Sequence, residues 1–209
     1  DMNGADSIML EIEDSIPVTE KDTARILVAE ALKSRKFKAE TVVRINHPTQ
    51  TPFGIDDLKT ILPAKPDLIR LPKTECVEEV ELVAGMIAEE EKKNGWPEGT
   101  INIICAIESV KGLYNVREIC HGPRMGAIAL GAEDFIADIK TQRTKYGIEL
   151  YFARSTILMA AREAGIRCID TVYSDVKDME TFRDEVTKIR DMGFDGKSCI
   201  NPKQIEVVH

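Results

Sequence analysis

The chain has 209 residues, a length that fits one large domain of the α/β class. Its composition, with 43% hydrophobic and 31% charged residues, is ordinary for a globular protein with a buried core. The net charge of −8 and the lack of a basic stripe exclude a typical nucleic-acid-binding protein. We find no signal peptide and no apolar run of about 18 residues, and therefore expect no membrane partner.

Five cysteines are scattered along the chain without a Cys-x-x-Cys pair. An odd and dispersed set is typical of free thiols in a reducing compartment. We therefore expect a cytoplasmic protein with free thiols at Cys76, Cys105, Cys120, Cys168 and Cys199.

Short apolar segments alternate with helical patterns along most of the chain. Strand-like segments are found at residues 7–13, 41–46, 67–73, 101–108, 125–131, 167–173 and 196–200. Helical spacing of apolar residues predicts helices at 19–34, 76–93, 149–165 and 179–193, and a further helix beginning at residue 201. Two of these helices end at a glycine, which favours the left-handed conformation of a helix end. Phe152 and Met159 lie on the helix at 149–165, and we expect them in the core.

Nearly unbroken apolar strands indicate a parallel sheet covered on both faces. A doubly wound sheet and a (β/α)8 TIM barrel both fit this pattern. No Gly-x-Gly-x-x-Gly motif follows the first strand, which argues against the dinucleotide-binding form of the first fold. Seven strands are one short of a barrel, so we expect a single barrel domain over residues 1–209 that lacks its first strand and its C-terminal segment.

Polar residues gather where the predicted strands end. The carboxyl ends of parallel barrel strands share one face, which carries the active site. The convergence of several such ends therefore indicates a site there. The residues concerned are Glu11, Glu13, Asp14, Arg44, Asn46, Arg70, Lys73, Glu108, Glu133, Asp134, Asp170, Tyr173 and Asn201.

Glu108 and the pair Glu133–Asp134 end two successive strands. Neighbouring strands lie about 5 Å apart, so one hard cation can bridge two such carboxylates, and Mg²⁺ typically takes one or two of them. Three histidines and no paired cysteines argue against zinc. Glu108 could instead favour the start of the following helix through its charge. The spacing does not separate Glu133 from Asp134 as the second ligand.

Arg44 and Lys73 are the basic residues of this set that are candidates for substrate binding or catalysis. Arg44 could clamp a substrate carboxylate through its planar guanidinium, or form a structural ion pair with Glu11 or Glu13. Lys73 could form a Schiff base, but its acidic neighbours favour the charged ammonium, so a charge-balancing role is the preferred interpretation.

Eight segments together carry a resemblance to a known family. They are "LEIEDSIP", "VVRIN", "IRLPKTE", "AIES", "GAEDF", "ELYFARSTILMAAREAG", "IDTVYSDV" and "GFDGKSCINPKQI". With these segments the chain resembles the HpcH/HpaI aldolase and citrate lyase family over essentially its whole length. A short motif such as "AIES" is weak alone, and the combination of the last two segments is the specific one.

The resemblance implies a (β/α)8 barrel and a Mg²⁺ ion held by Glu108 of "AIES" and Asp134 of "AEDF". It also implies that Arg44 of "VRIN" binds substrate. The implied activity is cleavage of citryl-acyl carrier protein to oxaloacetate and acetyl-acyl carrier protein. The implied partners are a citrate lyase alpha subunit and a gamma acyl carrier subunit, in a homo-oligomer or a hetero-oligomeric complex.

Some features depart from the family pattern, and two other functions stay open. The "LFVPG" strand and the C-terminal segment are absent, and Glu11 stands where many relatives have Asp. Asp14 and Glu13 are candidates for the general base or for support of the site. The alternatives to a citryl lyase subunit are a stand-alone lyase or thioesterase-like enzyme of citryl-CoA, malyl-CoA or another 3-hydroxyacyl-CoA, and a non-catalytic scaffold.

Overall fold

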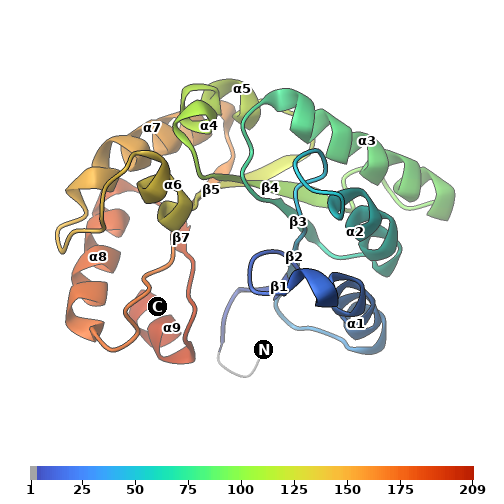
Figure 1. Cartoon of the computed structure of the whole chain (residues 1–209), viewed down its shortest axis with the longest axis horizontal. Coiled ribbons are helices and arrows are strands. Elements are labelled where there is room, and N and C mark those ends of the chain that lie inside the picture. Colours follow the sequence, from blue (N-terminus) through green and yellow to red (C-terminus); the bar gives the residue numbers. More distant parts are fainter. Residues whose placement is uncertain (1–3) are drawn as a thin grey trace. The chain divides into compact units, whose positions relative to one another are not determined.

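The computed structural model describes residues 4–209, and its strands form one seven-stranded sheet in the order β1-β2-β3-β4-β5-β6-β7. β1 pairs with β2, β2 with β3, β5 with β6 and β6 with β7, each in parallel. The predicted parallel α/β class is therefore confirmed. The order of the strands follows the chain from the first strand to the last, with helices between them (Figure 1).

The chain divides into two compact units. Among the described residues, unit 1 comprises residues 4–72, 77–104 and 122–126, and unit 2 comprises residues 73–76, 105–121 and 127–209. The strands β4 (Asn102–Ile107) and β5 (Met125–Leu130) contribute residues to both units. The expected single barrel domain over residues 1–209 stays a prediction, and residues 1–3 of that span lie outside the described part of the chain.

Unit 1 contains the first three strands and the helices between them. Its core is formed by strand residues such as Val43 and Ile69 and by helix residues such as Leu58 and Ile87, all of them fully buried. The described elements are β1 (Ser7–Glu11), η1 (Val18–Glu20), α1 (Lys21–Ser34), β2 (Glu40–Arg44), α2 (Gly54–Ile61), η2 (Leu62–Ala64), β3 (Leu68–Leu71) and α3 (Val77–Asn94).

Unit 2 contains the last two strands and the long helix α7. Its core includes Cys105, Ile128, Ile157 and Phe182. The described elements are α4 (Val110–Tyr114), α5 (Val116–Cys120), α6 (Ala132–Asp138), α7 (Ile148–Ala164), β6 (Arg167–Asp170), α8 (Met179–Met192), β7 (Gly196–Lys197) and α9 (Pro202–Val208).

All seven predicted strands and the four long predicted helices are present, and the strands are shorter than predicted. Gly165 and Gly193 follow α7 and α8 in the left-handed conformation, as their positions in the sequence predict. The expectation that Phe152 and Met159 are core residues is wrong, because they are 68% and 71% exposed on α7. Their helix instead buries the opposite face, which includes Leu150 and Ile157.

Candidate functional site

Glu108 follows the last residue of β4 and is buried, with 6% of its surface exposed. The amide of Gly131, just after β5, donates a hydrogen bond of 2.9 Å to the carbonyl of Ile107, which continues the pairing of the two strands to their ends. This pairing brings the backbone of Gly131 against the Glu108 side chain. A Cβ at residue 131 would stand 2.5 Å from Glu108 Cγ and 2.9 Å from its Oε1. Only glycine leaves room for the Glu108 carboxylate there.

Asp134 and Glu133 lie in the first turn of α6, which begins directly after Gly131. Their surroundings differ. Glu133 accepts a hydrogen bond of 2.6 Å from Ser174 Oγ and pairs with Arg143 Nη1 at 3.1 Å. Asp134 Oδ2 lies 3.4 Å from Lys73 Nζ, and half of the Asp134 side chain is exposed. The structure thus shows Glu133 in an ion pair and a hydrogen bond on the β6 side, and Asp134 facing the lysine that follows β3.

Glu108 and Asp134 are suited to a hard divalent cation. Both offer carboxylate oxygens, and the partly exposed Asp134 leaves access for waters and substrate oxygens, which such a cation retains. The missing side chain at Gly131 provides the space beside Glu108. Within residues 4–209 no group of three or more His, Cys, Asp and Glu side chains is arranged to hold a metal. A metal at this site would therefore be held by fewer than three such side chains.

Lys73 adopts a positive φ of 47° on a residue other than glycine. Such a conformation costs free energy and persists only where surrounding contacts hold it. The 3.4 Å contact with Asp134 matches the expected charge-balancing role, since a carboxylate stabilises the charged ammonium.

Arg44 is the last residue of β2 and stands in register with Glu11 of β1. Its Nε donates to Glu11 Oε2, and its Nη1 lies 3.1 Å from Glu13 Oε2. The structural ion pairs given by one of the two interpretations of Arg44 are therefore present. About a fifth of each of the Arg44 and Glu11 side chains is exposed, so Arg44 is reachable from solvent. Its contact with substrate stays a prediction.

Asp14 lies in the exposed turn after β1, next to the buried Glu13. Two side chains hold the backbone of this turn at Ile12. Lys21 Nζ donates to the carbonyl of Ile12 at 3.1 Å, and Asn46 Nδ2 donates to the same oxygen at 2.9 Å. Arg44 and Asp14 belong to unit 1, whereas Glu108 and Asp134 belong to unit 2.

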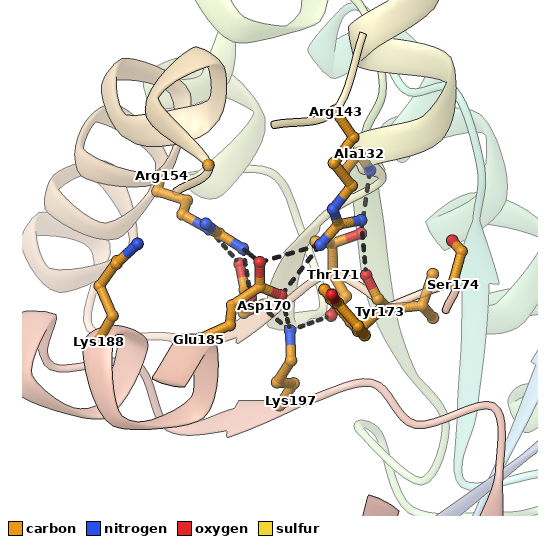
Figure 2. A network of polar contacts seen from close by, with 12 residues as sticks. Ala132, Arg143, Arg154, Asp170, Thr171, Tyr173, Ser174, Glu185, Lys188 and Lys197 are labelled. Atoms are coloured by element: carbon orange, nitrogen blue, oxygen red, sulfur yellow. Dashed lines mark hydrogen bonds and ion pairs between the residues drawn. The ribbon is translucent and has the colours of Figure 1, made fainter. Parts of the chain in front are cut away.

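A buried polar network in unit 2 was not foreseen from the sequence beyond Asp170. Arg154 of α7 donates from Nε and Nη2 to the two oxygens of Asp170, at 2.8 and 2.9 Å. Lys197 Nζ lies 2.8 Å from Asp170 Oδ2 and 2.7 Å from Glu185 Oε1 (Figure 2). Asp170 and Lys197 are partners in the β6–β7 register, which accounts for their closeness.

Three cations determine the charge of Glu185 in this network. Burial acts to raise the pKa of Glu185, but Lys197, Arg154 and Arg143 outweigh it and lower the pKa to about 2. The side chain of Glu185 is 9% exposed, so an unpaired charge there would be strongly destabilising. The network is thus a set of mutually dependent charges.

Residues 1–202 match the model of the family described as HpcH/HpaI aldolase/citrate lyase. The chain is 47% identical over 206 residues to citrate lyase subunit beta of Haemophilus influenzae, covering 98% of this chain and 70% of that protein. It is 30% identical over 206 residues to a (3S)-malyl-CoA thioesterase of Cereibacter sphaeroides, covering 98% and 68%. A solved structure of the citrate lyase beta subunit of Mycobacterium tuberculosis, complexed with oxaloacetate and magnesium, has a TM-score of 0.80 at 30% identity, covering 98% of this chain and 85% of that one.

A parallel sheet with carboxylates following β4 and β5 is typical of an α/β enzyme. Together with the similarities above, this makes the chain a lyase. It belongs to the HpcH/HpaI aldolase/citrate lyase family, as the eight sequence segments predict. Within residues 4–209, no helix combines the length and apolar character needed to cross a membrane.

Proposed function

We propose that the chain is a Mg²⁺-dependent carbon–carbon lyase that cleaves a citryl thioester to oxaloacetate and an acetyl thioester. The observation that carries this proposal is the buried Glu108 carboxylate against Gly131, with Asp134 in the following helical turn. The 47% identity to a citrate lyase subunit beta supports the citryl substrate. The magnesium and oxaloacetate in the relative from Mycobacterium tuberculosis support the ion and the product.

In this proposal Glu108 and Asp134 would hold Mg²⁺. Two carboxylates and the remaining positions for water and substrate oxygens match the preference of Mg²⁺. When bound, Mg²⁺ supplies positive charge that stabilises the negative charge developing on the substrate oxygens. Lys73 would stay close to the site and balance its negative charge.

The reaction breaks the bond between the carbinol carbon and the methylene carbon of the acetyl thioester. The hydroxyl proton passes to a base, and the carbinol carbon becomes the keto carbon of oxaloacetate. The electron pair of the broken bond goes to the acetyl thioester as an enolate, which takes up a proton to complete the reaction. We propose Asp14 as the base, because Lys21 and Asn46 hold the backbone of its turn at Ile12 while its side chain is exposed.

Arg44 binds a carboxylate of the oxaloacetate portion in this proposal. A guanidinium can share its donors between Glu11, Glu13 and a substrate carboxylate, since it carries five N–H groups. The two protein carboxylates also fix the orientation of Arg44 before substrate arrives, which limits the entropy lost on binding.

The proposed carrier of the citryl group is an acyl carrier protein, and the proposed partners are a citrate lyase alpha subunit and a gamma acyl carrier subunit. Exposed apolar side chains on unit 2 support an assembled enzyme, because such patches mark protein–protein contacts. Tyr114, Phe152 and Met159 line a hollow of about 340 Å³ between α4, α5 and α7. We also propose a cytoplasmic location, which the five free cysteines support.

We further propose that the seven-stranded sheet is part of a (β/α)8 barrel. The unbroken order of the strands and the alternation with helices support this. A second candidate function is a stand-alone lyase or thioesterase of malyl-CoA or a related 3-hydroxyacyl-CoA, because the chain is 30% identical to a (3S)-malyl-CoA thioesterase.

The test is release of oxaloacetate from citryl-CoA and from citryl-acyl carrier protein, with Mg²⁺ and with EDTA. We expect Mg²⁺-dependent release that is faster from the carrier protein. Faster release from CoA would support the stand-alone enzyme, and malyl-CoA cleavage without citryl cleavage would overturn the citryl assignment. A chain that assembles with the two partner subunits but cleaves none of these thioesters would be a scaffold.

A further inference from the structure

The helix α6, which carries Asp134, begins without a cap from its own sequence. Its N-cap residue is Gly131, and no side chain there can accept a hydrogen bond from the first amides of the helix. The proximity of Glu108 excludes a larger residue at this position, because a Cβ would overlap the Glu108 side chain. Because the Glu108 side chain occupies this space, residue 131 has no side chain that could cap α6.

Thr171 supplies the missing acceptor from another element. Thr171 Oγ1, in the residue after β6, accepts a hydrogen bond of 3.0 Å from the amide of Ala132, the first residue of α6. Thr171 is 2% exposed and Ala132 is 1% exposed, so water does not substitute for either group. The start of α6 is thus attached to the end of β6.

The buried network in turn fixes the backbone of Thr171. Lys197 Nζ donates a hydrogen bond of 2.7 Å to the carbonyl oxygen of Thr171. The same ammonium is held by Asp170 and Glu185, so its position is determined by two carboxylates. Arg143 adds a second attachment to this segment, since its Nη1 donates to the carbonyl of Val172 at 2.9 Å.

We infer that Thr171 is a positioning residue for the metal-binding pair Glu108 and Asp134. It acts through the amide of Ala132, which fixes the direction in which α6 leaves Gly131 and thus the position of Asp134 relative to Glu108. The inference rests on the proposed function, because it assigns a role toward the proposed Mg²⁺ site. Side chains that orient ligands typically change metal affinity by about 10- to 100-fold when they are lost.

The test measures the affinity of the full chain for Mn²⁺ by electron paramagnetic resonance and for Mg²⁺ by calorimetry. Thr171→Val keeps the shape of the side chain but removes the acceptor, and Thr171→Ser retains it. We expect Thr171→Val to weaken Mn²⁺ and Mg²⁺ binding by about 10-fold, and Thr171→Ser to bind within about twofold of the wild type. In activity assays, Thr171→Val should require more Mg²⁺ for half-maximal rate.

Thr41→Val is the matched control. Thr41 is a buried threonine of β2 whose Oγ1 donates a hydrogen bond of 2.7 Å to Asp67, within unit 1. Its loss should lower the melting temperature without changing metal affinity. If Thr171→Val and Thr41→Val lower stability equally and both bind Mn²⁺ as the wild type does, the role of Thr171 is structural only and the inference is overturned.

Two further measurements keep the outcomes separate. If Thr171→Val does not fold, Thr171→Ala and Thr171→Ser are compared, and equal Mn²⁺ affinity of these two variants overturns the inference. If the wild type binds neither ion, or if Asp134→Asn binds them as tightly as the wild type, the proposed metal site itself fails. Loss of binding in Asp134→Asn with full binding in Thr171→Val rejects the positioning role alone.

Discussion

The backbone of Gly131 lies against the side chain of Glu108, so closely that a Cβ on residue 131 would stand 2.5 Å from Glu108 Cγ. Real Cβ atoms do not approach other carbons to this distance. The φ of Gly131 is −102°, which any residue can adopt, so its requirement for glycine arises from space alone.

We therefore predict that Gly131→Ala displaces the Glu108 carboxylate and reduces Mg²⁺ affinity by at least about 10-fold. Overpacking also lowers stability, typically by about 1–3 kcal/mol. Calorimetric titration with Mg²⁺ and thermal unfolding check the two effects. Gly85→Ala is the control, because a Cβ at this position of α3 has no atom within 4 Å, and that variant should retain both affinity and stability.

The contacts of Glu133 and Asp134 predict which of the two is the ligand. Asp134→Asn should reduce the Mg²⁺-dependent rate by about 100-fold or more, because it removes a charged ligand of the proposed Mg²⁺ ion, which stabilises charge on the reacting oxygens. Glu133→Gln should change the rate by less than about fivefold, because Glu133 is held by Ser174 and Arg143. Steady-state rates over a range of Mg²⁺ concentrations check this, and the reverse ranking would assign the ligand role to Glu133.

For Arg44, the conservative change distinguishes substrate binding from structural pairing. Arg44→Lys keeps the positive charge but loses the planar donors that suit a carboxylate. We expect KM for the citryl thioester to rise by about 10-fold with a smaller change in kcat. If the melting temperature falls and KM does not change, the ion pairs with Glu11 and Glu13 are the whole role of Arg44.

Glu185 gives the protein a specific sensitivity to acid. Its pKa is lowered from an ordinary value of 4.5 to about 2, so its charged form stabilises the folded state above pH 4.5. That stabilisation is lost as pH falls from 4.5 toward 2, and the shift corresponds to about 3 kcal/mol. Urea unfolding of the wild type and of Glu185→Gln between pH 7 and pH 3 measures it. The variant should be less stable at pH 7 and should lose less stability on acidification, and parallel curves would contradict the assignment.

The strands and the long helices could be predicted from the sequence because their signals are local. Seven apolar segments and two terminating glycines were sufficient for most of the fold. The helix α2 was missed because its eight residues offer little more than two turns of periodicity. Phe152 and Met159 were misassigned because apolar character alone does not tell which face of α7 is covered.

The candidate site likewise has features that the sequence predicts and features that it does not. Glu108 and the pair Glu133–Asp134 could be located as charges that follow apolar strands, whereas the choice of Asp134 over Glu133 came from the family resemblance. The pairing of Arg44 with Glu11 follows from adjacent strands. The network of Arg154, Glu185 and Lys197 was not predictable, because its members come from α7, α8 and β7 and each reads in the sequence as an ordinary surface charge. Likewise, nothing near Gly131 in the sequence indicates that Thr171, forty residues later, caps α6.

The burial of Asp170 and Lys197 has a consequence for the ionic strength that the enzyme tolerates. Dissolved ions screen charges that they can surround, and at 1 M salt the screening length is about 3 Å. The pair between Arg117 and Glu163, which lies on the surface, should therefore weaken in concentrated salt. The contact between Asp170 and Lys197 is fully buried and excludes these ions. Because Lys197 fixes Thr171, which binds the first amide of α6, the attachment of α6 to β6 should be as stable in concentrated salt as in dilute buffer.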